Sequence, residues 1–209
     1  MNEITSEIAR IHAHLCGDGC VYLKKEKRSL RSLIKHPRKQ IYENVWVIEY
    51  TNKKRKLLEE FNQDLKTAFN RKGQWRPKYS RIQVSSVKWI VDFLQLRGKN
   101  SYNWFIPHSI MSANKNIIAM WIRAFFDDEA TVTDYGAIRV KCMNQNGLKQ
   151  IRDLLSIFKI RASLTGPNSD NSYYLYIYKK YNVQYQENIG FLHPEKREKL
   201  QKLKKMGPP

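Results

Sequence analysis

The apolar positions near the N-terminus follow a helical period. They recur every three or four residues and so share one helix face, at Ile4, Ile8, Ile11 and Leu15. A second stripe consists of small residues, Ala9, Ala13 and Gly17. Small side chains let another helix approach closely, and the glycines around Asp18 predict that this helix ends there.

The rest of the chain alternates between strand-like and helix-like patterns. We expect strands at 21–23, 45–50, 75–79, 81–85, 130–133, 137–143, 162–165 and 173–178. We expect further helices at about 53–69, 86–96, 112–126, 146–158 and 181–188, and one from Pro194 onward. Four polar residues are predicted as their N-caps: Asn52, Ser86, Ser112 and Asn146.

The order of these elements repeats. Helix, two strands, helix, two strands, helix occurs twice, which argues for duplication. Asp18 and Glu129 end matching helices and lie 111 positions apart (129 − 18), about half the chain length. We therefore predict an α+β fold with an N-terminal half at 1–98, a linker at 99–112 and a C-terminal half at 113–209.

The charge indicates a polyanionic partner. Lys and Arg total 38 against 19 acidic residues, a net charge of +19. A membrane surface fits less well, because the basic residues are spread along the chain and do not gather on one amphipathic helix. A merely solvated basic surface stays an alternative.

The N-terminus and the apolar runs give an expectation for the cellular location of the protein. No apolar run approaches the roughly 20 residues of a membrane helix, and the polar N-terminus does not resemble a signal or transit peptide. We expect a cytoplasmic or organellar protein that is not secreted and has no membrane partner.

The cysteines do not predict a disulfide framework. Only Cys16, Cys20 and Cys142 are present. His12, Cys16 and Cys20 stand four apart and could suggest zinc, but the glycines interrupt the helix before Cys20 and no second ligand pair exists. A small buried residue is the preferred interpretation of Cys16.

Two segments resemble one family motif. Residues 11–19, IHAHLCGDG, are similar to the LAGLIDADG motif, and residues 122–130, IRAFFDDEA, are similar to a second copy. Further family-like features are Val84–Ser85–Ser86, Ile106–Pro107, and Ile189–Gly190–Phe191 followed by Pro194, Lys196 and Leu200. The chain thus resembles the single-chain LAGLIDADG homing endonucleases of the archaeal and organellar intron-encoded type.

The resemblance implies an architecture and an activity. It implies two pseudo-twofold αββαββα halves, motif helices at their interface, and two antiparallel sheets that form a saddle for duplex DNA. The implied activity is double-strand cleavage of a long, partly palindromic site by a monomer, leaving short 3′ overhangs.

The eighth motif position holds the metal-binding acid, which implies Asp18 and Glu129 here. Apposed carboxylates repel unless divalent cations lie between them, and hard oxygen ligands favour Mg²⁺ or a similar ion. Such ions activate a water and stabilise the leaving oxygen. The resemblance adds the backbone carbonyls of Gly17 and Asp128 as ligands.

Several motif positions depart from the family pattern. Asp128 replaces a small residue, and Asp127 is expected to cap or to pair with a basic residue. Ala130 replaces a glycine, which would strain a turn of positive φ. His12 and His14 replace small or aliphatic residues and are expected to be packed rather than to bind metal.

Polar residues that follow the second strand of each half are candidate catalytic helpers, as the resemblance implies. These are Asn52 and Lys53 in the first half, and Asn144 and Gln145 in the second. Helix capping is the alternative role for Asn52. With Asp18 and Glu129, we predict Asn52, Lys53 and Gln145 as the catalytic set.

The exposed faces of the strands should contact DNA in the major groove. The candidates are Lys24, Lys27, Arg28, Arg31, Arg76, Lys78, Arg81, Arg139, Lys141, Arg161 and Tyr174. Trp75 and Tyr176 could instead belong to the core.

Other functions stay open at this point. A non-cleaving cofactor of intron RNA splicing (a maturase) would share the charge and the fold, as would a DNA-binding regulator without catalysis. A basic ribosome-associated protein would predict no cleavage and an affinity set by salt alone. The retained pair of acids favours the nuclease.

Overall fold

The computed structural model describes residues 3–28, 34–35 and 41–205. Its N-terminal half contains α1 (Ser6–Cys16), β1 (Gly19–Lys27), β2 (Tyr42–Thr51), α3 (Arg55–Phe69), β3 (Gln74–Arg76), the 3-10 turn η1 (Pro77–Tyr79), β4 (Arg81–Ser85) and α4 (Lys88–Phe93). The strands form an antiparallel sheet in the order β1-β2-β4-β3.

The C-terminal half repeats this arrangement. It contains α5 (His108–Met111), α6 (Lys115–Glu129), β5 (Ala130–Val132), β6 (Ile138–Cys142), α7 (Gln145–Ile157), β7 (Ala162–Thr165), β8 (Tyr173–Ile177), the 3-10 turn η2 (Lys179–Tyr181), α8 (Asn182–Asn188) and α9 (Pro194–Lys205). Its sheet has the order β5-β6-β8-β7. The predicted mixed fold with two equivalent antiparallel sheets is confirmed, whereas the boundaries at 98 and 113 stay predictions.

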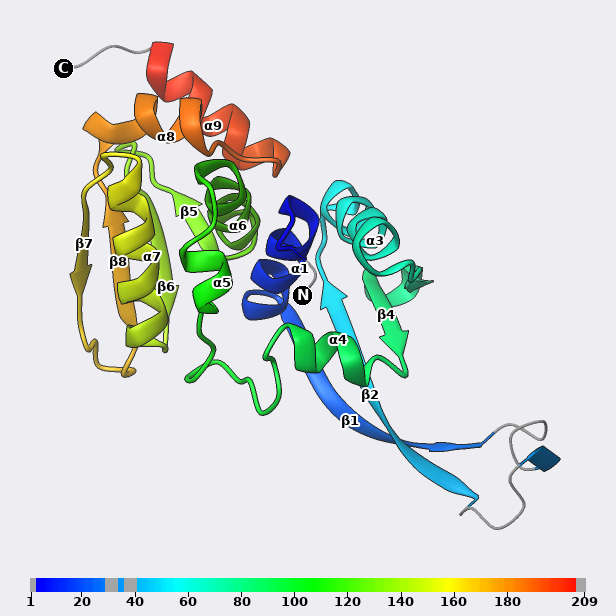
Figure 1. The fold of residues 1–209 in the computed structure, drawn as a ribbon. Coiled ribbons are helices and arrows are strands. Elements are labelled where there is room, and N and C mark those ends of the chain that lie inside the picture. Colours follow the sequence, from blue (N-terminus) through cyan, green and yellow to red (C-terminus); the bar gives the residue numbers. More distant parts are fainter. Residues whose placement is uncertain (1–2, 29–33, 36–40, 206–209) are drawn as a thin grey trace.

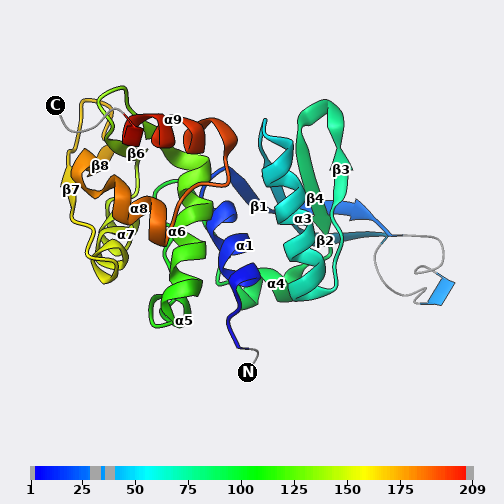
Figure 2. The ribbon, with the colours of Figure 1, turned by 90° about the horizontal axis from the view of Figure 1, so that it is seen from above.

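The two motif helices, α1 and α6, lie side by side between the two sheets (Figures 1 and 2). One apolar core runs through both halves and includes the fully buried Ile11, Leu15, Trp121 and Ile122. Ala9 and Ala13 are fully buried too. Small side chains permit close helix contact, and buried apolar area contributes roughly 25 cal/mol per Å². The helix pair therefore holds the halves together.

The sequence misplaced several helix starts. Asn144 caps α7 and Asn114 caps α6, because their side-chain oxygens accept from the N–H groups of Gly147 and Ile117, each at 3.0 Å. Asn146 and Ser112 are therefore not the caps. Likewise α3 begins at Arg55 after Lys54, not after Asn52.

Two further expectations in the N-terminal half are wrong. Ser86 does not cap α4, because its φ is +59° and Val87 precedes the helix. The strand expected to Tyr79 ends at Arg76, because Pro77 begins η1 and lacks the N–H that a ladder needs.

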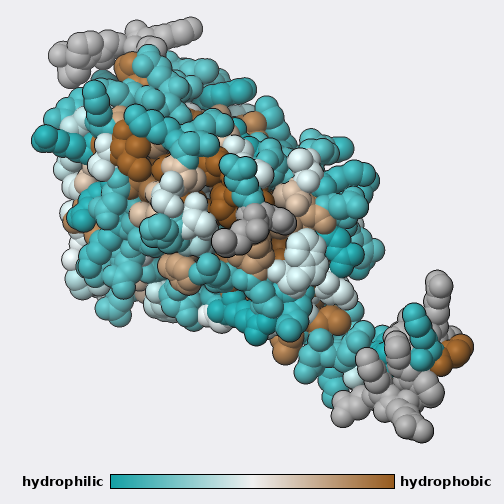
Figure 3. Space-filling model, viewed as in Figure 1, coloured by the Kyte–Doolittle hydropathy of each residue, from teal (hydrophilic) through white to brown (hydrophobic). Residues whose placement is uncertain are grey.

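The visible molecular surface in Figure 3 is largely hydrophilic, in keeping with the charge of the chain. The β1–β2 hairpin extends away from the body (Figure 1). Within the described ranges, we find no helix with the length and apolar character needed to cross a membrane.

The close approach of the motif helices generates a stability prediction. A Cβ atom on Gly17 would lie 2.9 Å from Oδ2 of Asp128, which is shorter than a normal contact. We expect Gly17→Ala to destabilise the protein by about 1–3 kcal/mol, as overpacked sites do. Urea unfolding measures this, and an unchanged midpoint would show that the helix ends are less tightly packed.

Candidate functional site

The ends of the motif helices bring two acids together. Glu129 is the last residue of α6, and Asp18 follows α1 by two positions. Burial raises the pKa of Glu129 to about 7, and the negative charge of Asp18 adds to this. Burial and the charge of Asp128 raise the pKa of Asp18 to about 6. The Asp18 carboxylate is thus close enough to Glu129 to oppose the ionisation of Glu129.

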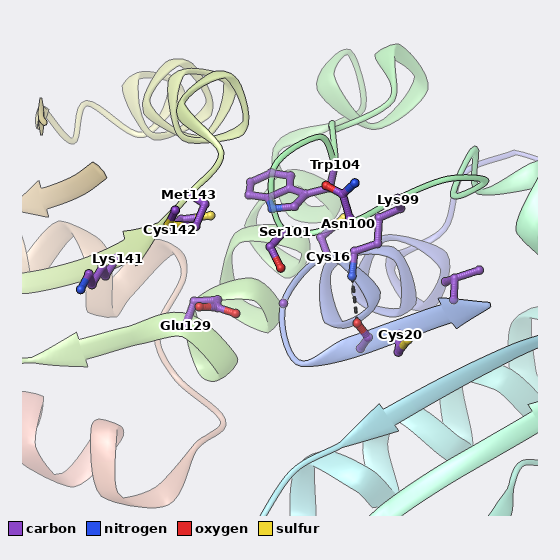
Figure 4. Close-up of a pocket in the computed structure, with 13 residues that line it drawn as sticks. Cys16, Cys20, Lys99, Asn100, Ser101, Trp104, Glu129, Lys141, Cys142 and Met143 are labelled. Carbon is purple, nitrogen blue, oxygen red and sulfur yellow. Dashed lines mark hydrogen bonds between the residues drawn. The ribbon is translucent and has the colours of Figure 1, made fainter. Parts of the chain in front are cut away.

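Asp18 and Glu129 line one cavity of about 540 Å³. It is also lined by Asn52, Lys53, Thr131 and Lys196. Glu129 also lines a second cavity of about 420 Å³, together with Gly17, Lys99 and Lys141. Figure 4 shows Glu129 and Lys99 in this second cavity.

The Asp128 carboxylate points into the protein. Its side chain is fully buried, and Oδ1 accepts from the Tyr50 hydroxyl at 2.6 Å, while Oδ2 lies 2.9 Å from His14 Nδ1. Although burial opposes it, the charge of Asp128 raises the pKa of His14. This network explains an acid at a usually small motif position: the side chain joins α6 to α1 and β2.

Asn52 connects this network to the cavity. Its Nδ2 donates to Asp18 Oδ2 at 3.1 Å and to Asp128 Oδ1 at 3.3 Å, and its Oδ1 accepts from the Lys54 N–H at 2.9 Å. The alternative prediction, that Asn52 caps α3, is wrong, because Lys54 is the N-cap residue and the Asn52 amide donates to the two acids. Asn52 therefore orients the Asp18 carboxylate.

Asp127 anchors the C-terminal segment. Its carboxylate accepts from the backbone N–H groups of Leu192, at 3.0 and 3.2 Å, and His193, at 2.8 Å. In return, Lys196 Nζ donates to three carbonyls at the end of α6, those of Phe126 at 3.1 Å, Asp127 at 2.6 Å and Asp128 at 3.1 Å. These reciprocal bonds bring the start of α9 to the acids.

Sequence reasoning missed two site lysines. Lys196 belongs to a family-like feature for which the sequence predicts no role, and Lys99 lies in the predicted linker. Lys99 Nζ donates to the Gly19 carbonyl at 2.8 Å, which the dashed line in Figure 4 marks. Burial lowers the pKa of both ammonium groups, whereas neighbouring acids, including Glu129, oppose this.

The remaining motif departures have simple structural roles. Ala130 has φ −83°, so no left-handed turn occurs and the expected strain is absent. His12 is fully buried, and its Nδ1 accepts from Trp121 Nε1 at 3.0 Å across the helix interface. Both histidines are packed residues.

The donor chemistry fits a hard divalent cation. In the described part of the chain, no group of three or more His, Cys, Asp and Glu side chains is arranged to hold a metal. A cation here would therefore use the Asp18 and Glu129 carboxylates with helix-end carbonyls. It would also relieve the repulsion between the two acids. Of the predicted ligands, the Asp128 carbonyl already accepts from Lys196.

The predicted catalytic helpers divide into two groups. Asn52 and Lys53 line the cavity that holds Asp18 and Glu129. Gln145 is the first residue of α7 and lines neither of the two cavities. The residues that follow the second strand in each half are therefore not placed equivalently around the two acids.

The strand register gives the first sheet one polar face. Paired residues lie on the same face, and this face carries Lys24, Arg76 and Arg81. It also carries Tyr22, Glu49 and Gln83, which bond to one another and to Arg81. Trp75 pairs with Ile82 on the opposite face and packs against the core.

The second sheet has an equivalent polar face. Arg139 pairs with Tyr176 and Lys141 pairs with Tyr174. The Arg139 guanidinium lies 5.0 Å from the Tyr174 ring centre, and Lys141 pairs with Asp170 at 2.5 Å. Tyr176 therefore lies on the polar face and not in the core.

The other predicted DNA contacts are more scattered. Lys27 is exposed at the outer end of the β1–β2 ladder, Lys78 is exposed in η1, and Arg161 is exposed just before β7. Arg28 is buried and lies 3.7 Å from Glu43. Arg31 falls outside the described residues. Burial thus makes Arg28 the least accessible of these candidates.

The opposed acids generate a pH prediction for the metal-free protein. The pKa of Glu129 is about 7 in the folded chain against an ordinary value of 4.5, so ionisation opposes folding increasingly from pH 4.5 to 7. We expect Glu129→Gln in EDTA to raise stability by on the order of 1–3 kcal/mol at pH 8 and by much less near pH 4.5. Thermal unfolding at both pH values measures this, and an equal effect at each would contradict it.

Comparison with known sequences finds one family model that matches part of the chain. The sequence model of the LAGLIDADG-like domain matches residues 116–190, which include all of α6 but its first residue, and the second sheet. A curated relative, glutamine–fructose-6-phosphate aminotransferase of Methanocaldococcus jannaschii, is 25% identical over 171 residues, 75% of this chain. The chain spans only 16% of the length of that relative.

Solved structures share the fold of the whole chain. Mesophilic variants of the homing endonuclease I-DmoI match with a TM-score of 0.65 and 17% identity, covering 88% of this chain and 94% of that one. I-DmoI in complex with DNA and Mn matches at 0.62 and 17%, covering 88% and 96%. Full-length DUF199/WhiA from Thermatoga maritima matches at 0.59 and 13%, covering 99% and 62%. Residues 116–190 therefore match the LAGLIDADG-like domain, and the chain shares with these structures a fold built around two motif helices.

Proposed function

We propose that the chain is a metal-dependent endonuclease that binds duplex DNA as a monomer and cuts both strands of a long, partly palindromic site. One observation carries this proposal: Asp18 and Glu129, from the two motif helices, meet in one cavity. In the proposed organisation, halves at 1–98 and 113–209 are joined by a linker at 99–112.

The two polar sheet faces support a DNA partner. Each presents basic side chains beside hydrogen-bonding groups, Arg76 and Arg81 on one and Arg139 and Lys141 on the other. Cationic groups neutralise phosphates, and a two-stranded β-ribbon fits into the major groove of B-DNA. Similar I-DmoI structures hold DNA with Mn or Ca, which favours the same partner and a divalent ion here.

The acids and their neighbours have separable roles in this mechanism. Asp18 and Glu129 would hold the divalent cation, which supplies an activated water and stabilises the leaving oxygen when bound. Asn52 orients Asp18 through its amide. Lys53 lines the same cavity and can place its ammonium near a phosphate. The hydrogen bond between Asp128 and His14 joins α6 to α1.

Cleavage is tested with a random duplex library in Mg²⁺ or EDTA. We expect cutting only with Mg²⁺, and Asp18→Asn or Glu129→Gln to reduce it by about 100- to 1000-fold or more, because each removes one charged ligand. Both variants should keep DNA affinity. The matched control is Asp134→Asn, an exposed acid paired with Lys199 outside the cavity.

The outcomes discriminate among the candidates. Wild-type cutting rates in either acid variant would refute the assigned acids. Sequence-selective DNA binding without cutting under any metal would instead indicate a DNA-binding protein of the same fold. Tighter binding to structured RNA than to any duplex would indicate the splicing cofactor.

The polar faces generate a binding prediction. We expect Arg76→Ala to weaken binding of the selected site by about 5- to 150-fold, as the loss of one base or phosphate contact does. Lys149→Ala, an exposed lysine on α7, is the control and should change little. Fluorescence anisotropy at several salt concentrations measures this, and equal affinities for both variants would exclude this face.

A further inference from the structure

Lys196 brings a positive charge to the acid pair from a distant part of the chain. Its ammonium contacts the carbonyls of residues 126–128 within 3.1 Å. Its electrostatic partners include Asp18, Asp127, Asp128 and Glu129. The ammonium therefore already contacts one carbonyl that a divalent cation would use, that of Asp128, and lies within electrostatic range of both carboxylates.

The position of this lysine is built into the fold. The Asp127 carboxylate accepts from the N–H groups of residues 192 and 193, which are four and three positions before Lys196. At the neighbouring position, Glu195 pairs with Lys54 of the other half. Three anchors from both halves thus hold the start of α9 beside the cavity.

Lys99, the first residue of the proposed linker, is placed similarly. Lys99 follows α4 as Lys196 follows α8, and it too donates to a backbone carbonyl beside a motif acid, that of Gly19 at 2.8 Å. Glu129 is among its electrostatic partners. A helix end concentrates partial negative charge, which a cation stabilises. A lysine therefore contacts a backbone carbonyl near each motif acid, at the end of α6 and at the start of β1.

We infer that Lys196 is a tethered cation that competes with a divalent ion for the Asp128 carbonyl, so that metal binding displaces its ammonium from this oxygen. This inference rests on the proposed function, because it assumes that the acids bind metal. Two cations in one partly buried site repel each other. Lys196 is thus a positioning residue that weakens metal affinity while, in the absence of metal, it bonds the carbonyls at the end of α6.

The test measures Mn²⁺ binding to the DNA-free full chain by electron paramagnetic resonance. Lys196→Gln keeps amide donors for the carbonyls but removes the charge, and Lys196→Met removes both. We expect both to bind Mn²⁺ at least about tenfold more tightly than the wild type, because the competing charge is gone. Lys199→Gln, on the same helix but paired with Asp134, is the matched control and should bind as the wild type does.

A readout on the unaltered protein covers the case in which a variant does not fold. The acetylation rate of Lys196 relative to Lys199, followed by mass spectrometry, should rise severalfold when saturating Mg²⁺ releases the ammonium. Unchanged Mn²⁺ affinity in folded Lys196→Gln, or an unchanged acetylation ratio, would overturn the inference and leave a structural helix cap.

Failure of the proposed function gives a different result. If Glu129→Gln and the wild type bind Mn²⁺ equally, the acids are not metal ligands and the proposed function is refuted. If Glu129→Gln loses the site while Lys196→Gln matches the wild type, only the role of Lys196 is refuted.

Discussion

The close packing of α1 against α6 is the contact on which the rest of this structure depends. It buries apolar residues of both halves in one core and leaves no room for a side chain at Gly17. The same contact forces carboxyl groups at the helix ends into a shared, partly dehydrated space. Stability and the candidate chemistry therefore arise from one interface. The apolar contacts stabilise it, and the ionised acids destabilise it.

Buried polar bonds compensate for that unfavourable charge. The Asp128 carboxylate is hydrogen-bonded to His14 and Tyr50, and that of Asp127 to backbone N–H groups of the C-terminal segment. Only Asp18 and Glu129 lack a comparable set of donors facing them. This contrast separates acids that maintain the fold from acids that are available for a ligand, although all four lie within one turn of a helix end.

Local patterns in the sequence predicted what local physics determines. The apolar period of α1, the alternating strands and the matched acids all follow from neighbours in the chain. The role of Asn52 did not, because its amide finds Asp18 and Asp128, 34 and 76 positions away, in place of a helix end. Lys99 and Lys196 were missed for the same reason, since their carbonyl partners are 80 and 68 to 70 positions distant.

The two hairpins differ greatly in reach. The β1–β2 ladder pairs nine residues of β1, from Gly19 to Lys27, whereas the β5–β6 ladder pairs three, from Ala130 to Val132. At about 3.3 Å per residue, one arm is roughly 30 Å long and the other roughly 10 Å. A rod-like ligand lying across both sheets would be contacted far from the centre at one end only, by the long β1–β2 hairpin. Such a protein would recognise which way round its ligand lies, even where the ligand's own two halves are nearly alike.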